Sequence, residues 1–192
     1  MIALLILTKQ IEIYAWLMLF ALIHELAHMC VGIILKLKPK TLEIEPFGIG
    51  IIFESFENTE KNKIKIAIAG PLINLIIAII FQFIQTKYQS QIVNSNLLLA
   101  TFNLIPIYPL DGGRILKSVI RIQKTNDKTD EIINKTSNFI MILITAISSI
   151  LILIYKNIGL LLIILYLWVV VIKENKKYAL KKKIRKLLDK NT

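Results

Sequence analysis

The only two histidines of this 192-residue chain lie four positions apart, in the sequence His24-Glu25-Leu26-Ala27-His28. Four residues make slightly more than one helical turn, so both imidazoles would project from one face of a helix and could bind one metal ion. Glu25, between them, is placed to take a proton from a water molecule at that ion. The spacing therefore predicts a metal site with hydrolytic chemistry.

A third metal ligand has to be found elsewhere, because a catalytic zinc site commonly has three protein ligands and one open position. Between Glu60 and Asp127 the chain has a single acidic residue, Asp111, which follows an apolar run interrupted by two prolines. We expect Asp111 to complete a site for one zinc ion per chain. The alternative is a turn of Asp and Gly residues that ends a helix at the membrane interface. Cys30, the only cysteine, is a further candidate ligand, although a small packing residue is the commoner case.

Two asparagines lie in otherwise apolar segments, and each has two possible roles. Asn74 ends the sequence Gly70-Pro71-Leu72-Ile73-Asn74, and Asn103 precedes the two prolines. A buried amide could hydrogen-bond the backbone of an unwound substrate, which would otherwise lack partners in a membrane. It could equally hold two helices together.

The elements that carry these residues are predicted to be membrane helices. Hydrophobic residues make up 55% of the chain, and apolar runs recur at lengths near the ~20 residues that cross a bilayer. We predict an all-α polytopic membrane protein with about six transmembrane segments: a short one at 1–7, then 11–37, 64–86, 92–108, 139–155 and 158–172. One intramembrane domain would cover residues 1–172, followed by a basic tail at 173–192.

Segment 41–57 differs from the rest, because polar and apolar residues partly alternate and Pro46, Gly48 and Gly50 interrupt it. This pattern predicts a small β-hairpin at the membrane edge. Its backbone could pair with an extended substrate by strand addition. Ile49 and Ile51 are the residues whose N–H groups we expect to serve there.

The net charge of +11 lies mainly in the segments 36–65, 114–136 and 173–190, which alternate with segments that carry few basic residues. The positive-inside rule places these three segments, and thus the C-terminus, in the cytoplasm. The arrangement offers no basic groove with interleaved aromatic residues, so we expect no nucleic acid partner. The bilayer itself is the partner that the charge pattern indicates.

The three segments of interest together resemble the three motifs of site-2 proteases, the intramembrane zinc metalloproteases of peptidase family M50. The motifs are the histidine pair with Glu25, the segment from Gly70 to Asn74, and the segment from Asn103 to Gly113. The likeness extends over about residues 11–120. The uninterrupted Pro109-Leu110-Asp111-Gly112-Gly113-Arg114 is most similar to the sporulation branch of that family.

The resemblance implies a site and a reaction. His24, His28 and Asp111 would be zinc ligands, Glu25 the catalytic acid/base, and Asn74 and Asn103 would lie near substrate. The substrate would be a membrane-associated protein, with a sporulation sigma-factor precursor as the candidate. The protease itself would lie in a bacterial cell membrane, where inhibitory membrane partners are also expected. Two alternatives remain: a membrane metal transporter, which leaves Glu25 without a role, and a catalytically inactive relative that binds membrane partners.

Overall fold

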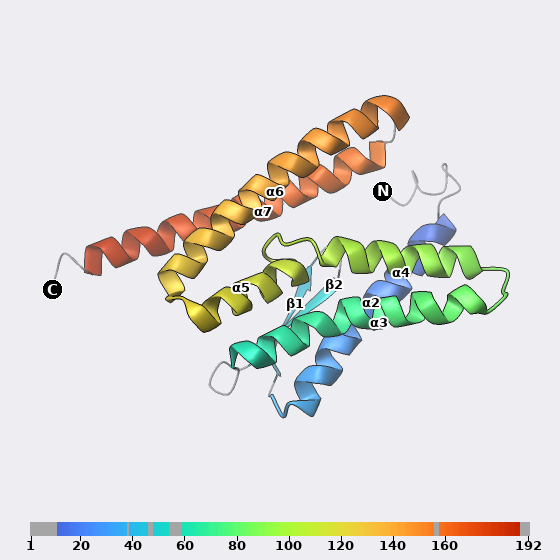
Figure 1. The fold of residues 1–192 in the computed structure, drawn as a ribbon, viewed down its shortest axis with the longest axis horizontal. Coiled ribbons are helices and arrows are strands. Elements are labelled where there is room, and N and C mark those ends of the chain that lie inside the picture. The colour runs from blue at the N-terminus through green and yellow to red at the C-terminus, as the bar shows by residue number, and fades with distance from the viewer. Residues whose placement is uncertain (1–10, 38, 46–47, 54–58, 156–157, 189–192) are drawn as a thin grey trace. The chain divides into compact units, whose positions relative to one another are not determined.

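The computed structural model describes residues 11–37, 39–45, 48–53, 59–155 and 158–188. The chain divides into two compact units, one ending at Leu104 and the other beginning at Ile105. Each unit is built mainly of helices (Figure 1). The predicted helical architecture is therefore confirmed, whereas the 1–7 segment lies outside the described residues.

The first unit contains three helices and a pair of strands: α2 (Ile11–Ile34), β1 (Pro39–Glu45), β2 (Gly48–Phe53), α3 (Glu60–Phe83) and α4 (Gln89–Asn103). The three helices pack against one another, and β2 packs against α2. The strands are antiparallel, with Ile49 opposite Ile44 and Ile51 opposite Leu42. The position of this strand pair at a membrane edge stays a prediction.

Helix α3 is shaped for close contact with its neighbours. Its N-terminus is capped by Thr59, whose side-chain oxygen accepts a hydrogen bond from the Asn62 backbone N–H at 3.3 Å. Its buried face consists mostly of small residues, namely Ala67, Ala69, Gly70, Pro71, Asn74 and Ala78. Small side chains let helix backbones approach closely, which is how membrane helices commonly associate. The helix continues through Pro71 and brings its small face to the other helices of the unit.

The second unit contains α5 (Asp111–Gln123), α6 (Asn126–Tyr155) and α7 (Ile158–Leu188). Helix α6 packs against both α5 and α7. The last helix does not end near residue 172 but continues through the basic segment as far as Leu188. The predicted tail is therefore helical over most of its length.

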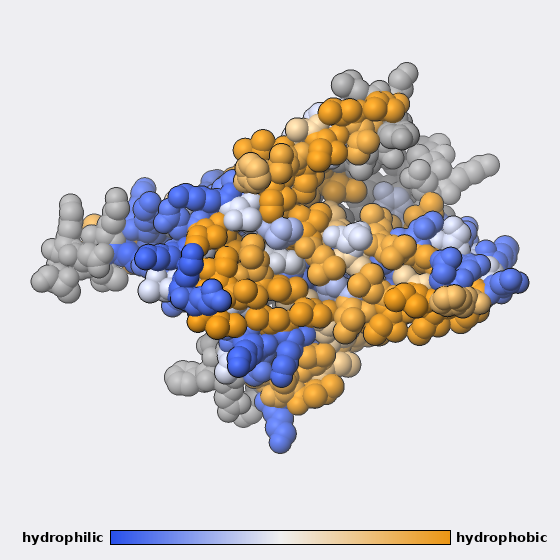
Figure 2. Space-filling view, viewed as in Figure 1, coloured by the Kyte–Doolittle hydropathy of each residue, from blue (hydrophilic) through white to orange (hydrophobic). Residues whose placement is uncertain are grey.

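Three helices in the described part of the chain are long and apolar enough to cross a membrane: Glu12–Ile34, Glu60–Phe83 and Asn126–Ile152. Large apolar side chains of α3 are nevertheless exposed, among them Ile79 and Phe83. Figure 2 shows hydrophobic residues along the visible side of α3 and hydrophilic residues near its two ends. Such exposure is costly in water and favourable in lipid. The chain is an integral membrane protein, while the larger number of about six spans is not confirmed.

Two predicted segments differ from the structure. The 92–108 span is replaced by α4, which has 15 residues and ends at Asn103, because the residue before Pro106 disfavours helical backbone. The predicted 114–136 loop is instead helical, and contains most of α5 and the start of α6. The amphipathic helix α5 is too short and too rich in charged residues to be recognised as a membrane span from its sequence.

Candidate active site

The two histidines project from α2, and the Nδ1 atom of each ring is hydrogen-bonded to α3. His28 donates a hydrogen bond from Nδ1 to the Ile66 backbone oxygen at 2.6 Å. His24 Nδ1 lies 3.2 Å from Oδ1 of Asn74, an oxygen that can only accept. Both rings therefore carry their proton on Nδ1, which leaves the Nε2 lone pairs available to a metal. Both side chains are buried.

The two Nε2 atoms converge beside Gly70 of α3. A Cβ atom at this glycine would lie 2.5 Å from Nε2 of His24 and 2.5 Å from Nε2 of His28. Zinc binds histidine nitrogen at about 2.0–2.1 Å. Only a glycine lets α3 approach both imidazoles this closely, and two neighbouring imidazole nitrogens are donors that zinc prefers. The residues present fit this metal.

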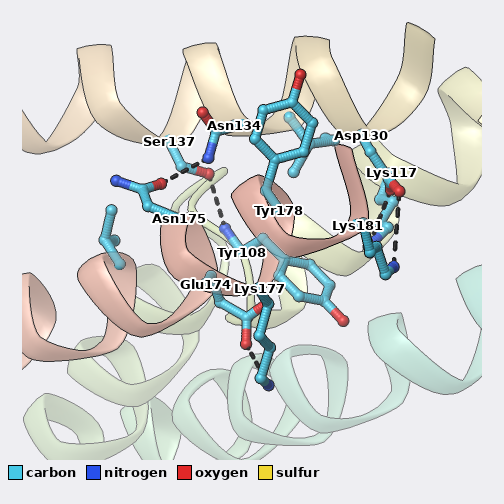
Figure 3. A pocket seen from close by; sticks show the side chains of 12 residues that line it. Tyr108, Lys117, Asp130, Asn134, Ser137, Glu174, Asn175, Lys177, Tyr178 and Lys181 are labelled. Carbon is cyan, nitrogen blue, oxygen red and sulfur yellow. Dashed lines mark hydrogen bonds and ion pairs between the residues drawn. The ribbon is translucent and has the colours of Figure 1, made fainter. Parts of the chain in front are cut away.

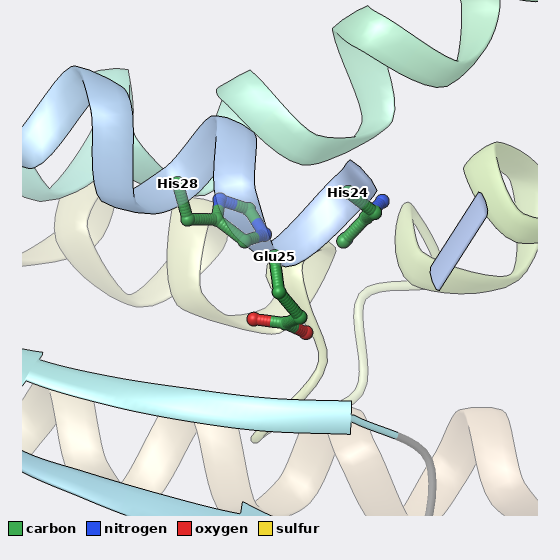
Figure 4. A group of neighbouring side chains, drawn as sticks. All are labelled: His24, Glu25 and His28. Carbon is green, nitrogen blue, oxygen red and sulfur yellow. The ribbon is translucent and has the colours of Figure 1, made fainter. Parts of the chain in front are cut away.

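Glu25 completes a group of three candidate ligands with the histidines. One ligand atom from each of the three residues lies within 4.8 Å of the others. Figure 4 shows the three side chains on α2, with the Glu25 carboxylate pointing away from the helix toward a strand of the hairpin. The carboxylate is only half-buried, unlike the histidines. It can reach a water molecule at the metal and remain open to a substrate.

Asp111 is the first residue of α5 and belongs to the second unit. Its side chain is buried, and Oδ1 lies 3.9 Å from Nη1 of Arg114. A carboxylate is favourable at a helix N-terminus. Gly113 lets the preceding connection fold back here, since a Cβ at that position would lie 2.4 Å from the Tyr108 backbone nitrogen. Its role as third metal ligand stays a prediction.

The two asparagines singled out in the sequence make different contacts. Asn74 is fully buried and binds His24, so it joins α3 to α2; its Nδ2 has no hydrogen-bond partner among the described residues. Asn103 donates from Nδ2 to the Leu99 backbone oxygen of its own helix at 3.0 Å. A contact of either residue with substrate stays a prediction. Cys30 is exposed and is not part of the His-Glu-His group.

Sequence reasoning missed three features of this site. It gave no role to the Ile66 carbonyl, and it treated Gly70 only as a helix irregularity. It also passed over Asn96 of α4, which is fully buried and donates from Nδ2 to the Ile92 backbone oxygen at 2.8 Å. The Asn96 Oδ1 atom has no hydrogen-bond partner within the described segments. Buried unmatched polar atoms are rare and often mark functional sites.

Comparison with known proteins finds similarity to zinc metalloproteases. Residues 86–144, which include Asn103 and Asp111, match the model of peptidase family M50. A zinc metalloprotease from Methanocaldococcus jannaschii is 31% identical over 120 residues, covering 55% of this chain and 35% of that protein. Stage IV sporulation protein FB from Bacillus subtilis is 29% identical over 140 residues, covering 69% of this chain and 48% of that protein. Over these segments the chain is similar to proteins of peptidase family M50.

The fold of the chain is also similar to that of a solved structure. A site-2 protease from Methanocaldococcus jannaschii aligns with a TM-score of 0.66 and 24% identity, covering 90% of this chain and 85% of the other. The chain spans between 30% and 50% of the length of the curated relatives it matches.

The contact between Asn74 and His24 yields a prediction for this site. Replacing Asn74 with leucine removes the acceptor for the His24 Nδ1–H, and we expect zinc affinity to fall by about 10- to 100-fold. Asn74→Asp keeps an oxygen acceptor and should retain most of the affinity. Competition with a chromogenic chelator on the purified protein measures both. Equal zinc affinity in Asn74→Leu and wild type would show that this contact does not orient the ligand.

Proposed function

We propose that this chain is an intramembrane zinc metalloendopeptidase that hydrolyses a peptide bond in a membrane-associated protein. The observation that carries the proposal is the position of the two histidine Nε2 atoms, which lie close together against Gly70. Their Nδ1 atoms are engaged by Asn74 and Ile66, so the pair is oriented in advance for a metal. Glu25 lies in the same group.

His24, His28 and Asp111 would hold the zinc ion. When bound, zinc lowers the pKa of a coordinated water toward ~7 and polarises the scissile carbonyl. Two imidazoles and one carboxylate form a donor set well known for catalytic zinc. The arrangement leaves an open position for water and substrate.

Glu25 acts as the base and then as the acid. Its carboxylate would take a proton from the attacking water as the new C–O bond forms, and would then pass this proton to the amide nitrogen, after which the peptide C–N bond breaks and the amine leaves. Because Glu25 is only half-buried, it can exchange the proton with solvent between turnovers.

The substrate has to be unwound before it is cut, because a helix hides its carbonyls in i→i−4 hydrogen bonds. Strand β2 packs against α2, the helix that carries the histidines. This neighbourhood supports the hypothesis that the substrate adds to the strand pair through the N–H groups of Ile49 and Ile51. Asn74 and Asn103 are candidates to hold the freed backbone.

The sporulation relative supports a finer proposal. Stage IV sporulation protein FB is one of the proteins to which this chain is similar, and we propose a sporulation sigma-factor precursor as the candidate substrate. Inhibitory membrane partners belong to the same proposal. The basic residues that continue along α7 support a cytoplasmic C-terminus in a bacterial cell membrane.

Two other functions fit the site less well. A metal transporter would use buried histidines, but it needs no carboxylate between them. An inactive relative that only binds membrane partners would not need His24, His28 and Glu25 to lie together in one group. Loss of peptide hydrolysis without loss of zinc in a Glu25 variant would exclude both alternatives.

The zinc content of purified variants tests the ligand set. Wild type should contain about one zinc per chain, whereas His24→Ala and His28→Ala should lose both metal and activity, because two remaining ligands hold zinc poorly. Asp111→Asn should bind zinc more weakly. Cys30→Ala is the matched control on α2 and should keep full metal content. Full activity in the Asp111 variant would contradict its assignment as a ligand.

The strand pair is tested with prolines in β2. Successive N–H groups of a strand point alternately to the neighbouring strand and to the free edge. Ile49→Pro and Ile51→Pro remove donors on one side, and Gly50→Pro and Ile52→Pro remove donors on the other. Because the proposal uses the N–H groups of Ile49 and Ile51, we expect at least one of Ile49→Pro and Ile51→Pro to cut processing of a co-expressed substrate strongly while zinc content stays at wild type. Normal processing in all four would mean that the strand pair serves only as a cover.

A further inference from the structure

The second unit contains a cavity of about 240 Å³. It lies between the polar halves of α6 and α7 and is also lined by Tyr108 and by Lys117 of α5. Figure 3 shows the lining side chains, with Lys117 and Lys181 both joined to Asp130 by ion pairs. The cavity has no part in the proposed hydrolysis.

The charges around the cavity do not balance. Asp130 is buried and interacts with three cations: Lys117 Nζ at 3.5 Å, Arg121 Nη2 at 3.3 Å and Lys181 Nζ at 3.6 Å. One carboxylate therefore faces three positive groups. A fourth cation in the lining, Lys177, is already matched by Glu174 at 2.6 Å. Lys117 and Lys181 therefore share Asp130 as their one carboxylate partner among the described residues.

Lys117 is the most constrained of these cations. Burial lowers the pKa of its ammonium group, and the neighbouring cations add to that effect while Asp130 opposes it. The ammonium lies 4.0 Å from the centre of the Tyr108 ring, a cation–π contact that offers partial compensation. A second anion beside Lys117 would remove the remaining cost of keeping a charge here.

The polar lining suits an acceptor-rich ligand. The amides of Asn134 and Asn175 are bonded to each other, with Asn134 Nδ2 donating to Asn175 Oδ1 at 2.6 Å. They form a polar wall, and the phenol groups of Tyr108 and Tyr178 add donors. A phosphate group carries the negative charge and the several acceptor oxygens that such surroundings can satisfy, and lysine is a common binder of phosphate.

We propose that this cavity binds a phosphate group through Lys117 and Lys181. The phosphate could come from the headgroup of an anionic phospholipid or from a soluble phosphate compound, because the cavity lies in the polar part of the helix pair. The proposal does not depend on the proteolytic activity, and it is tested by binding alone.

The test uses the full chain carrying Glu25→Gln, which avoids self-cleavage. In neutral detergent, inorganic phosphate should raise Tm above the value in sodium chloride of equal ionic strength, and the titration gives an apparent Kd. In a separate arm without phosphate, native mass spectrometry counts phosphatidylglycerol retained from mixed phosphatidylglycerol–phosphatidylcholine nanodiscs. A response in the first arm points to a soluble source, and a response in the second points to a lipid headgroup.

Variants decide whether the cavity is responsible. Lys117→Gln and Lys181→Gln should each weaken binding by at least about tenfold. Lys181 is 57% exposed, so its variant should fold even if that of Lys117 does not. Lys135→Gln is the matched control, because it removes the same charge from a lysine that is 75% exposed on α6 and paired with Glu131. Equal binding by Lys181→Gln and Lys135→Gln, or no binding in either arm, would overturn the proposal and leave Asp130 as a structural ion cluster.

Discussion

Replacing Glu25 with glutamine should lower peptide hydrolysis by at least about 100-fold while zinc stays bound. Glutamine has the size of glutamate but cannot accept the proton of the attacking water. The two histidines keep their contacts with Asn74 and Ile66 in this variant, since neither contact involves Glu25. Metal analysis and a cleavage assay on the same preparation measure both outcomes.

The matched control for this prediction is Glu12→Gln. Glu12 lies in the first turn of the same helix and is exposed, so its variant carries the same charge change away from the histidines. We expect its activity to equal that of wild type. If Glu25→Gln turned over substrate at the normal rate, another group would have to act as the base.

Replacing Gly70 with alanine should abolish stoichiometric zinc binding. The new Cβ would lie 2.5 Å from both Nε2 atoms, so both imidazoles would have to move out of the positions in which they can share a metal. We expect zinc affinity to fall by about 100-fold or more, and activity to fall with it. Alanine is otherwise the better helix former by roughly 0.5–1 kcal/mol, so the loss would not be a helix-propensity effect.

Leu72→Phe separates the metal effect from general changes in α3. Leu72 lies two residues further along the helix and is 50% exposed, so a larger side chain there extends into lipid. This variant should keep its zinc. If Gly70→Ala also kept one zinc per chain, the histidines would have to bind the metal on a side away from α3.

The sequence alone predicted the histidine pair and its shared helix face, because residues four apart on a helix lie on one face whatever surrounds them. It could not predict what orients the rings. The partners Asn74 and Ile66 lie 50 and 38 residues from the histidines they contact, and the alignment of α3 against α2 follows from packing rather than from any local pattern. The special role of Gly70 depends on that same alignment.

The fold was predictable where hydropathy is strong and not where it is mixed. Helices α2 and α3 follow long apolar runs, and both were predicted within a few residues. Helix α5 was missed because its charged residues break the apolar pattern, and α4 was overextended because the apolar run continues past Asn103 into a non-helical connection. The ion cluster at Asp130 joins α5, α6 and α7, so it could not be predicted from any single segment of the sequence.

The contacts between α2 and α3 have a mechanical consequence. The Nδ1 atoms of His24 and His28 are hydrogen-bonded to α3, and their Nε2 atoms lie close to Gly70 of the same helix. A shift of α2 relative to α3 by a fraction of a turn would therefore move both imidazoles away from a metal bound between them. These two helices therefore have to travel as one rigid body through every catalytic cycle. An opening that admits a substrate from the side therefore has to form elsewhere than between α2 and α3.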